Sequence, residues 1–338
     1  MSITLTLAGL DAAALRSLSV VEVSRALDGF DALHAVLVLP DAGLDAFSGL
    51  KIGGAWSAKV DTETFKGDIT RVSLRAEPGG APTLVVEGLE RLHRLRVQRM
   101  SKVGEQSPDQ VAKALIALAG ASADARSTQT AAEPTVLLDA PALGALKRIA
   151  AERNFTVWSD GKKVRFAPRN TPEGAAVAVQ WASEVVSIDF AADLSGIPTA
   201  VKVTGVDYRK GPEVIEHEAT GSDLKKLSGG KDAVALAKGG MGALPLLLAE
   251  GPSRATAAEV KERAVGELQS RAERFVQGTV RLAVLLPAAA PGRKLELKGA
   301  PWPFCGPFLI SGVEHRGSPR DPGSTSIRFF SDSLPVGP

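Results

Sequence analysis

The strongest constraint on the fold is the series of short strand-like runs that fills the first ninety residues. Ser2–Ala8 alternates polar and apolar residues, and Val20–Arg25 and Ala32–Leu39 follow on either side of the turn-like Asp28-Gly29. Successive side chains of a strand point to opposite faces, so alternation predicts half-buried strands. Closely spaced strands of this kind favour a sandwich or a barrel.

Three further runs continue this pattern. Lys51–Val60 contains Gly53-Gly54, which suits a bulge or a turn. Thr64–Arg75 and Thr83–Leu89 flank Glu77-Pro78-Gly79-Gly80, which predicts a hairpin. The first block is therefore expected to be entirely β.

The middle of the chain has helical periodicity. Ser107 suits the N-cap of a helix, Pro108 its first position, and Gly120 its end. Asp139 is expected to cap a second helix over 140–153, with Leu143, Leu146, Ile149 and Ala150 on its inner face. A loop over 121–134 is expected before it. Phe155–Trp158 and Lys163–Ala167 then predict a hairpin around Ser159-Asp160-Gly161.

The rest of the chain predicts more strands, one irregular stretch and one long helix. Residues 209–253 are expected to be irregular, because Ser228-Gly229-Gly230 and Lys238-Gly239-Gly240-Met241-Gly242 lie within them. Residues 254–277 carry an amphipathic helical pattern with Val260, Ala264, Leu268, Ala272 and Phe275 near one face. The expected strands are Val185–Phe190, Thr199–Val206, Thr279–Leu286, Lys294–Lys298, Phe308–His315 and Ser324–Phe330.

Composition excludes several classes of protein. Cys305 is the single cysteine, so neither an intrachain disulfide nor a cysteine-built metal site can form. The 40 basic and 38 acidic residues nearly balance, which gives no general case for nucleic acid. Residues 91–170 hold 14 basic and 7 acidic residues, a local excess that suits an acidic partner surface or a solvated face. No run of 18 apolar residues predicts a membrane span, and the N-terminus lacks the pattern of a signal peptide.

Candidate chemical sites are weak throughout. His34, His93, His217 and His315 form no HxxxH or HxH pair of the kind that zinc sites use. Lys238-Gly-Gly-Met-Gly could cradle a phosphate, but it lacks the GK[ST] ending of a phosphate loop. A mobile loop is the plainer interpretation.

Two carboxylate pairs and one basic cluster remain as candidates. Asp61 with Glu63 on a strand face, or Glu259 with Glu262 on a helix, could supply an acid and a base for sugar cleavage. Neither pair has aromatic neighbours that would stack a sugar. The basic cluster of Arg91, Arg94, Arg96, Arg99 and Lys102, with His93 among them, is expected on a strand and favours a protein interface or a solvated face. We therefore assign no catalytic, cofactor-binding or metal residue, and we expect no enzyme activity.

Five ordered segments resemble the late control D family of contractile phages and the related hub region of VgrG and phage-like injection systems. The segments are Phe65–Val72 with Leu84–Leu95, Ser107–Leu115, Leu143–Ala167, Ala200–Asp207 and Gly306–His315. Leu89-Glu90 stands where the family usually has an aspartate. The five segments agree with the family in order and spacing, and together they span most of the chain.

The resemblance implies an α+β fold, mostly β, with two tube-like antiparallel β-barrels, a small α/β domain and a helix-containing insertion. The expected domains are a first barrel over 1–93, the α/β domain over 94–181, a second barrel over 182–208 plus 278–338, and the glycine-rich insertion with its helix over 209–277.

The same resemblance implies a structural role. Three copies would form a pseudo-sixfold ring that joins a sixfold tail tube to a threefold spike, with baseplate wedge proteins as further partners. Because the sequence stops at Pro338, the spike is expected to be a separate polypeptide. The protein would be made in the bacterial cytoplasm and end in the baseplate of a phage tail or injection particle. Two alternatives stay open, a tail-associated cell-wall hydrolase and a receptor- or carbohydrate-binding tail module.

Overall fold

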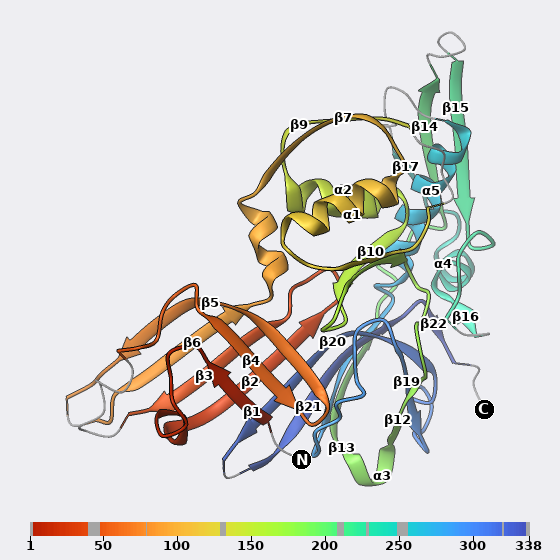
Figure 1. Cartoon of the computed structure of the whole chain (residues 1–338). Coiled ribbons are helices and arrows are strands. Elements are labelled where there is room, and N and C mark those ends of the chain that lie inside the picture. Colours follow the sequence, from red (N-terminus) through yellow and green to blue (C-terminus); the bar gives the residue numbers. More distant parts are fainter. Residues whose placement is uncertain are drawn as a thin grey trace.

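The computed structural model describes residues 3–39, 48–78, 80–128, 133–207, 213–227, 230–248, 256–319 and 321–335. Ser228-Gly229, Gly79 and Arg254, to which the sequence analysis assigns turns and a helix start, lie outside these residues. Figure 1 shows a large sheet in the lower part of the molecule and a helical unit above it. A pair of long strands, β14 and β15, extends beside that unit.

The first block forms one half of the large sheet. Its strands are β1 (Ile3–Leu7), β2 (Leu18–Ala26), β3 (Ala32–Val38), β4 (Ala55–Val60), β5 (Glu63–Arg75) and β6 (Thr83–Leu89), with a short 3-10 helix, η1 (Ala14–Ser17), between β1 and β2. They lie in the order β1-β4-β5-β6-β3-β2 and every neighbouring pair is antiparallel. Alternate residues are buried along these strands, so the predicted hairpins and their alternation are confirmed.

The last block continues the same sheet. Strand β2 pairs with β20 (Pro307–Ser318), and the order runs on through β21 (Asp321–Ser331), β18 (Val276–Leu282) and β13 (Val185–Ala192). Strand β20 also pairs with β19 (Lys294–Lys298), which pairs in parallel with β12 (Val177–Gln180). The mostly β class is confirmed. In the part of the chain that is described, no strand pairing closes either half into a barrel, so the two barrels remain a prediction.

The α/β unit follows β6. Its elements are the 3-10 helix η3 (Arg91–Arg96), β7 (Arg99–Gln106), α1 (Pro108–Leu118), β8 (Ala123–Ala125), β9 (Glu133–Pro141), α2 (Ala142–Glu152), β10 (Phe155–Ser159) and β11 (Val164–Pro168). The β10–β11 hairpin, the N-cap position of Ser107 and the place of Pro108 at the start of α1 are as predicted. In Figure 1, β7 and β9 arch around both helices.

Three local predictions in this unit are wrong. The chain coils as a 3-10 helix over Arg91–Arg96, where a strand is expected, because Leu92 and Leu95 are three residues apart and both enter the core. Asp139 has a φ of 47° and does not cap α2, whose N-cap residue is Pro141. The expected loop over 121–134 contains β8, which pairs in parallel with β11.

The insertion is more regular than expected. It contains β15 (Glu213–Thr220), β16 (Lys231–Asp232), α4 (Ala233–Met241), β17 (Pro245–Leu248) and α5 (Ala257–Ala272), and β14 (Ala200–Asp207) directly precedes it. Over the described residues 213–227 and 230–248, the prediction of an irregular segment is wrong, because Asp232 accepts a hydrogen bond from the amide of Ala235 and starts α4 on an alanine-rich run. Helix α5 is shorter than the predicted 254–277, since Val276 and Gln277 already belong to β18.

Strand pairing also differs from the expected grouping at two places. Thr199–Val206 is expected in the second β-rich block, but β14 pairs with β15 and β17 in a separate three-stranded sheet. Strand β12, which lies in the range of the α/β domain, pairs with β19 of the large sheet. The division into four domains itself stays a prediction. The short elements α3 (Trp181–Glu184) and β22 (Ser333–Leu334) complete the fold.

Three apolar clusters fill the interior. The first lies under the N-terminal strands, the second between the helices and hairpin of the α/β unit, and the third between α5 and the C-terminal strands. Leu285, from the C-terminal half, is buried in the first cluster. Its neighbour Leu286 packs against the third cluster, so the first and third clusters meet at this point.

Candidate functional surfaces and buried ionic junctions

One face of the large sheet packs on the cores and the other carries polar side chains. In register across five strands, Arg316 of β20 faces Glu22 of β2, Glu22 faces His34 of β3, and His34 faces Glu87 of β6. Glu87 then faces Arg71 of β5. Ion pairs of 3.4 Å (Arg316 to Glu22) and 3.6 Å (Arg71 to Glu87) stand at the two ends of this row.

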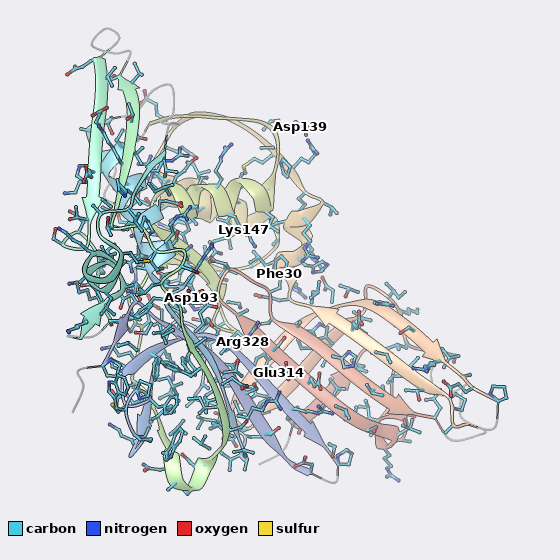
Figure 2. All side chains as sticks on the ribbon, turned by 180° about the vertical axis from the view of Figure 1, so that it is seen from behind. Phe30, Asp139, Lys147, Asp193, Glu314 and Arg328 are labelled. Carbon is cyan, nitrogen blue, oxygen red and sulfur yellow. The ribbon has the colours of Figure 1, made fainter. Side chains whose placement is uncertain are left out.

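This polar row crosses the seam between the two halves of the sheet. Figure 2 shows Glu314 and Arg328 on the C-terminal half of that sheet. Alternating charges on one sheet face stabilise cross-strand neighbours by a few tenths of a kcal/mol to about 1 kcal/mol per pair. The polar row thus belongs to a solvated sheet face that both halves share.

A first buried junction lies where β2 meets the α/β unit and β20. Arg25 sits at an inward position of β2, and its Nε lies 3.1 Å from Oδ2 of Asp31, with both side chains almost wholly buried. The Arg25 guanidinium also stands 4.3 Å above the ring of Phe65. The backbone amide of Asp31 donates to Glu90 across 3.5 Å. We call these residues, with the nearby Asp160, the Arg25 junction.

Burial dominates the titration of the Arg25 junction. Burial raises the pKa of Asp31 to about 7. Arg25 opposes this shift, whereas the charges of Glu90 and Asp160 add to it. Burial also raises the pKa of Glu90. Because burial outweighs the attraction of Arg25, Asp31 binds a proton near neutral pH.

His315 borders the same junction from β20. It is buried, its Nδ1 lies 3.1 Å from Oγ1 of Thr325, and its ring meets Phe65 edge to face. Burial, and then the charge of Arg25, lower its pKa to about 4. His315 is therefore neutral at physiological pH and serves packing.

A second junction joins the N-terminal strands, the α/β unit and the segment that follows α5. Arg169, at the end of β11, contacts Glu273 after α5 at 3.2 Å and Asp28 after β2 at 3.4 Å. Burial raises the pKa of Glu273 to about 7, against the pull of Arg169. Asn170 donates to Asp332 at 2.7 Å close by. We call this set the Arg169 junction.

Two carboxylates that the sequence offered as a catalytic pair have a structural role instead. Arg153, after α2, contacts Glu259 at 2.8 Å and Glu262 at 3.1 Å on α5. Oε2 of Glu259 also accepts the amide of Thr256 and closes the N-terminal capping box of α5. The pair therefore fastens the α/β unit to α5.

The other acidic pair is not a matched acid and base. Asp61 lies in the turn between β4 and β5 with a φ of 52°, and Glu63 begins β5, so the two do not share a strand face. Glu63 lines a cavity of about 720 Å³ between the sheet and the α/β unit, together with Arg25, Trp158, Arg165 and Arg293. Arg165 is bound there by Asp160 and Asp124, so its charge is largely satisfied.

The basic cluster is used mostly within the chain. Arg94 makes a two-pronged contact with Asp68 at 2.8 and 3.0 Å, and Arg96 stands 4.7 Å over the ring of Phe30. Arg99 pairs with Asp139 at 2.7 Å. Arg91 is exposed, and the side chain of Lys102 lies outside the described part.

The remaining candidates are dispersed. His34 lies on β3, Nδ1 of His93 donates to the carbonyl oxygen of Glu90 at 2.8 Å, and His217 lies on β15. Lys238-Gly-Gly-Met is the last turn of α4, where its amides are used by the helix. Cys305 is exposed. The described residues contain no cluster of three or more metal-ligating side chains, and none of their helices is long and apolar enough to cross a membrane.

The residues of the two junctions were not singled out from the sequence. Arg25 carries a usable signal, because it continues the inward series of Val21 and Val23 in β2 and places a charge where an apolar residue is expected. Glu273 and Arg169 carry none, since each looks like an ordinary surface charge until distant segments are brought together.

Solved structures of tail proteins share the fold. The 43 kDa tail protein of prophage MuSo2 from Shewanella oneidensis is 14% identical with a TM-score of 0.72, over 99% of each chain. A tail protein of Neisseria meningitidis is 14% identical with a TM-score of 0.70, over 98% of this chain and 96% of that one. An Escherichia coli component of the type VI secretion system, described as similar to T4 tail proteins gp27 and gp5, is 12% identical with a TM-score of 0.61, over 98% and 79%.

At these identities the likeness shows the fold, which is that of phage tail proteins and a type VI secretion component. No curated protein matches the sequence significantly. The family model that matches is not a late control D model, so that part of the expected resemblance is not confirmed. The model covers residues 50–318, which is most of the sequence, and is described as the Alg8 N-terminal domain. The chain belongs to the family of the Alg8 N-terminal domain.

Proposed function

We propose that this protein is a structural hub in the baseplate of a contractile phage tail or of a related injection particle. Three copies would form a ring that adapts a sixfold tail tube to a threefold spike, without catalysing a reaction. The observation that carries this proposal is the architecture of the large sheet, supported by a fold shared end to end with phage tail proteins.

The sheet supplies two comparable pieces per copy. Strands β5-β6-β3-β2 form one antiparallel group of four, and β20-β21-β18-β13 form a second beside it. Three copies would then present six four-stranded groups around an axis, which meets a sixfold tube on one side and keeps threefold symmetry for a spike on the other. The resemblance to the late control D family supports the same assignment.

The buried junctions support a rigid adaptor. The Arg25 and Arg169 junctions and the pairing of β2 with β20 fix the two groups of strands relative to each other and to the α/β unit. A part that matches two symmetries needs fixed angles between its halves. The ion pairs of Glu259 and Glu262 with Arg153 favour a structural role for these carboxylates over a catalytic one.

The decisive experiment measures the mass of the assembly. The purified chain is examined by native mass spectrometry alone and after co-expression with tube and spike proteins from the same gene neighbourhood. We expect trimers, alone or with the spike, and larger complexes when tube protein is added. A chain that stays monomeric in the presence of both partners would overturn the proposal. Release of soluble fragments from purified peptidoglycan would instead support the hydrolase alternative.

A further inference from the structure

A hollow with an excess of positive charge lies between the N-terminal strands and the α/β unit. It has a volume of about 590 Å³, and residues of β1, β4 and β5 line it together with residues of η3 and of the turn between β10 and β11. Its charged lining consists of four cations and one carboxylate, namely Lys66, Arg91, Lys162, Lys163 and Glu90. We call this cavity the basic hollow. It contains part of the basic excess that the sequence shows over 91–170.

The four cations of the basic hollow have no ion-pair partner among the described residues. All four are exposed, and none has a carboxylate oxygen within 4 Å there. Several lysines on other elements do have such a partner, namely Lys113, Lys202, Lys226 and Lys298. A concave surface that carries one sign of charge concentrates the electric field and attracts ligands of the opposite sign. The ligand of the basic hollow is therefore expected to be an anion.

Glu90 does not offset these four charges. Its Oε2 accepts the backbone amide of Asp31 across 3.5 Å and so belongs to the Arg25 junction. Burial raises the pKa of Glu90, so this carboxyl gives up its proton less readily than an exposed one does. Four positive charges thus stand against at most one negative charge.

The turn between β10 and β11 holds two of the cations in place. Oδ1 of Asp160 accepts the backbone amides of Lys162 and Lys163, at 2.9 and 2.8 Å. Oγ of Ser159 accepts the amide of Gly161 at 3.1 Å. Because the backbone of the turn is fixed before a ligand arrives, less ordering is needed when the two lysines bind one.

A buried guanidinium beneath the same turn adds to the positive charge. Arg25 lies against Gly161, and its Nη2 has no hydrogen-bond partner among the described residues. Arg25 also lines the cavity of about 720 Å³ described above, which shares Lys162 with the basic hollow. The positive surface thus continues from one cavity to the other past Lys162. An extended segment that carries several carboxylates fits this surface better than a single small ion does.

The uncharged lining favours a polypeptide over a nucleic acid. Thr6 faces Ser57 across the β1–β4 pair, and Ser57 faces Lys66 across the β4–β5 pair, so hydroxyl donors adjoin a cation. Hydroxyl groups can donate to carboxylates and to peptide carbonyls. Trp56 is the aromatic residue that lines the hollow, and it is only 2% exposed. Single-stranded nucleic acid is bound largely by stacking of its bases on exposed aromatic rings, which the hollow does not offer.

We propose that the basic hollow binds an acidic segment of another protein, whose Asp or Glu carboxylates lie against Lys66, Arg91, Lys162 and Lys163. The inference goes beyond the proposed ring and does not depend on it. The contact is made by exposed charges, so it weakens as salt screens them.

The experiment measures binding of a fluorescein-labelled hexaglutamate peptide to the full chain by fluorescence anisotropy at low salt. Hexaglutamine of the same length is the uncharged control peptide. The variants of the hollow are Lys66→Glu, Lys162→Glu and Lys163→Glu. Lys261→Glu, at an exposed lysine of α5, is the matched control because it changes the net charge equally. Circular dichroism and the thermal midpoint of each variant show whether the fold is retained.

We expect Lys66→Glu, Lys162→Glu and Lys163→Glu each to weaken binding of hexaglutamate on the order of tenfold, because each replaces an attraction by a repulsion. Lys261→Glu should change binding less than about twofold, because its charge lies away from the hollow and is screened. Lys162→Arg keeps the charge and should keep the binding. Equal losses for Lys162→Glu and Lys261→Glu, or equal binding of hexaglutamate and hexaglutamine, would overturn the inference.

Two further measurements identify the occupant. A hexathymidylate oligonucleotide that binds more tightly than hexaglutamate, with the same dependence on Lys162, would overturn the choice of a protein ligand. Self-association of the parent chain that Lys162→Glu abolishes would overturn the choice of another protein and assign the hollow to a second copy. Loss of the inference in any of these ways leaves the hub proposal standing if native trimers form, whereas a monomer with tube and spike present ends the hub proposal alone.

Discussion

At the residue scale, the most informative positions are charges buried where a strand or turn passes between two cores. Arg25 is held by Asp31 and lies against Phe65, and Gly161 packs on the same guanidinium. A buried ion pair is weak evidence for stability, but removing one partner leaves an uncompensated charge and is costly. These residues fix the geometry of the molecule more than they add to its net stability.

Gly161→Ala tests the packing of the Arg25 junction. Gly161 has a φ of 84°, and a methyl group there would meet Nη2 of Arg25 at 2.6 Å. Gly120 has a φ of 70° and open space around it, so Gly120→Ala pays the backbone cost alone. We expect Gly120→Ala to lose about 1 kcal/mol and Gly161→Ala about 1–3 kcal/mol more, from strain and a displaced buried charge. Urea unfolding measures both, and equal losses would contradict the contact.

The buried carboxyls predict an unusual pH dependence. Asp31 and Glu273, with pKa values raised to about 7, stabilise the fold below their ordinary pKa, and this contribution disappears as pH rises through 7. His315, with its pKa lowered to about 4, acts in the opposite sense between pH 6.5 and 4. The folded protein keeps two protons, on Asp31 and Glu273, that the unfolded chain releases, whereas the unfolded chain binds one, on His315, that the folded protein does not. The free energy of unfolding therefore falls as pH rises from about 5 to above 7.

Glu273→Gln should reduce by one the number of protons by which the folded and unfolded states differ. The slope of the unfolding free energy between pH 5 and 7 should then change by about 1.4 kcal/mol per pH unit, which corresponds to one proton. Denaturant unfolding at several pH values measures the slope. Glu77→Gln, an exposed residue, is the control and should leave the slope as it is. A parent chain whose stability rises steadily from pH 5 to 8 would contradict the assignment.

At the element scale, local signals predicted what local chemistry determines. Ser107 and Pro108 predicted the start of α1, and alternation predicted most strands of the large sheet. Gly239 and Gly240 wrongly predicted an irregular segment before α5. They lie within α4, which forms on an alanine-rich run capped by Asp232. The end of α5 was misplaced because its amphipathic pattern merges into β18 without a glycine or a proline.

Glu259 of helix α5 both takes part in the capping box and pairs with Arg153, and substitutions can separate these two contributions to stability. Thr256→Ala removes the cap and should cost about 1 kcal/mol, while Thr256→Ser should cost little. Glu259→Gln keeps an oxygen for the cap but loses a charge opposite Arg153, 2.8 Å away. We expect a larger loss for Glu259→Gln than for Thr256→Ala. Thermal unfolding of the three variants ranks them, and the reverse order would show that the cap dominates.

At the scale of the whole molecule, sequence reasoning could not foresee how the blocks meet. The pairing of Val23 with His315, or of Arg169 with Asp28 and Glu273, depends on segments far apart in the chain that carry no shared local signal. The fold class could be predicted because it depends on periodicity. The junctions could not, because they depend on three-dimensional closure.

Arg169→Met tests the junction that unites all three blocks. It leaves Glu273 and Asp28 without their cation, and we expect a loss of about 3–5 kcal/mol. Arg148→Met removes an exposed pair with Glu152 at 3.9 Å on α2 and should cost well under about 1 kcal/mol. Tryptophan fluorescence during urea unfolding measures both. A difference within error between them would show that the blocks are held together without the Arg169 junction.

The pairing of β2 with β20 also sets the timing of synthesis. Strand β2 leaves the ribosome early, but the residues that cover its free edge, Gly312–Gly317, follow almost three hundred positions later. At about 5–20 residues per second that interval lasts on the order of 15–60 s. Throughout it the nascent chain displays an open strand to its neighbours on the polysome, so we expect recovery of native protein to depend on chaperone supply and on slow expression.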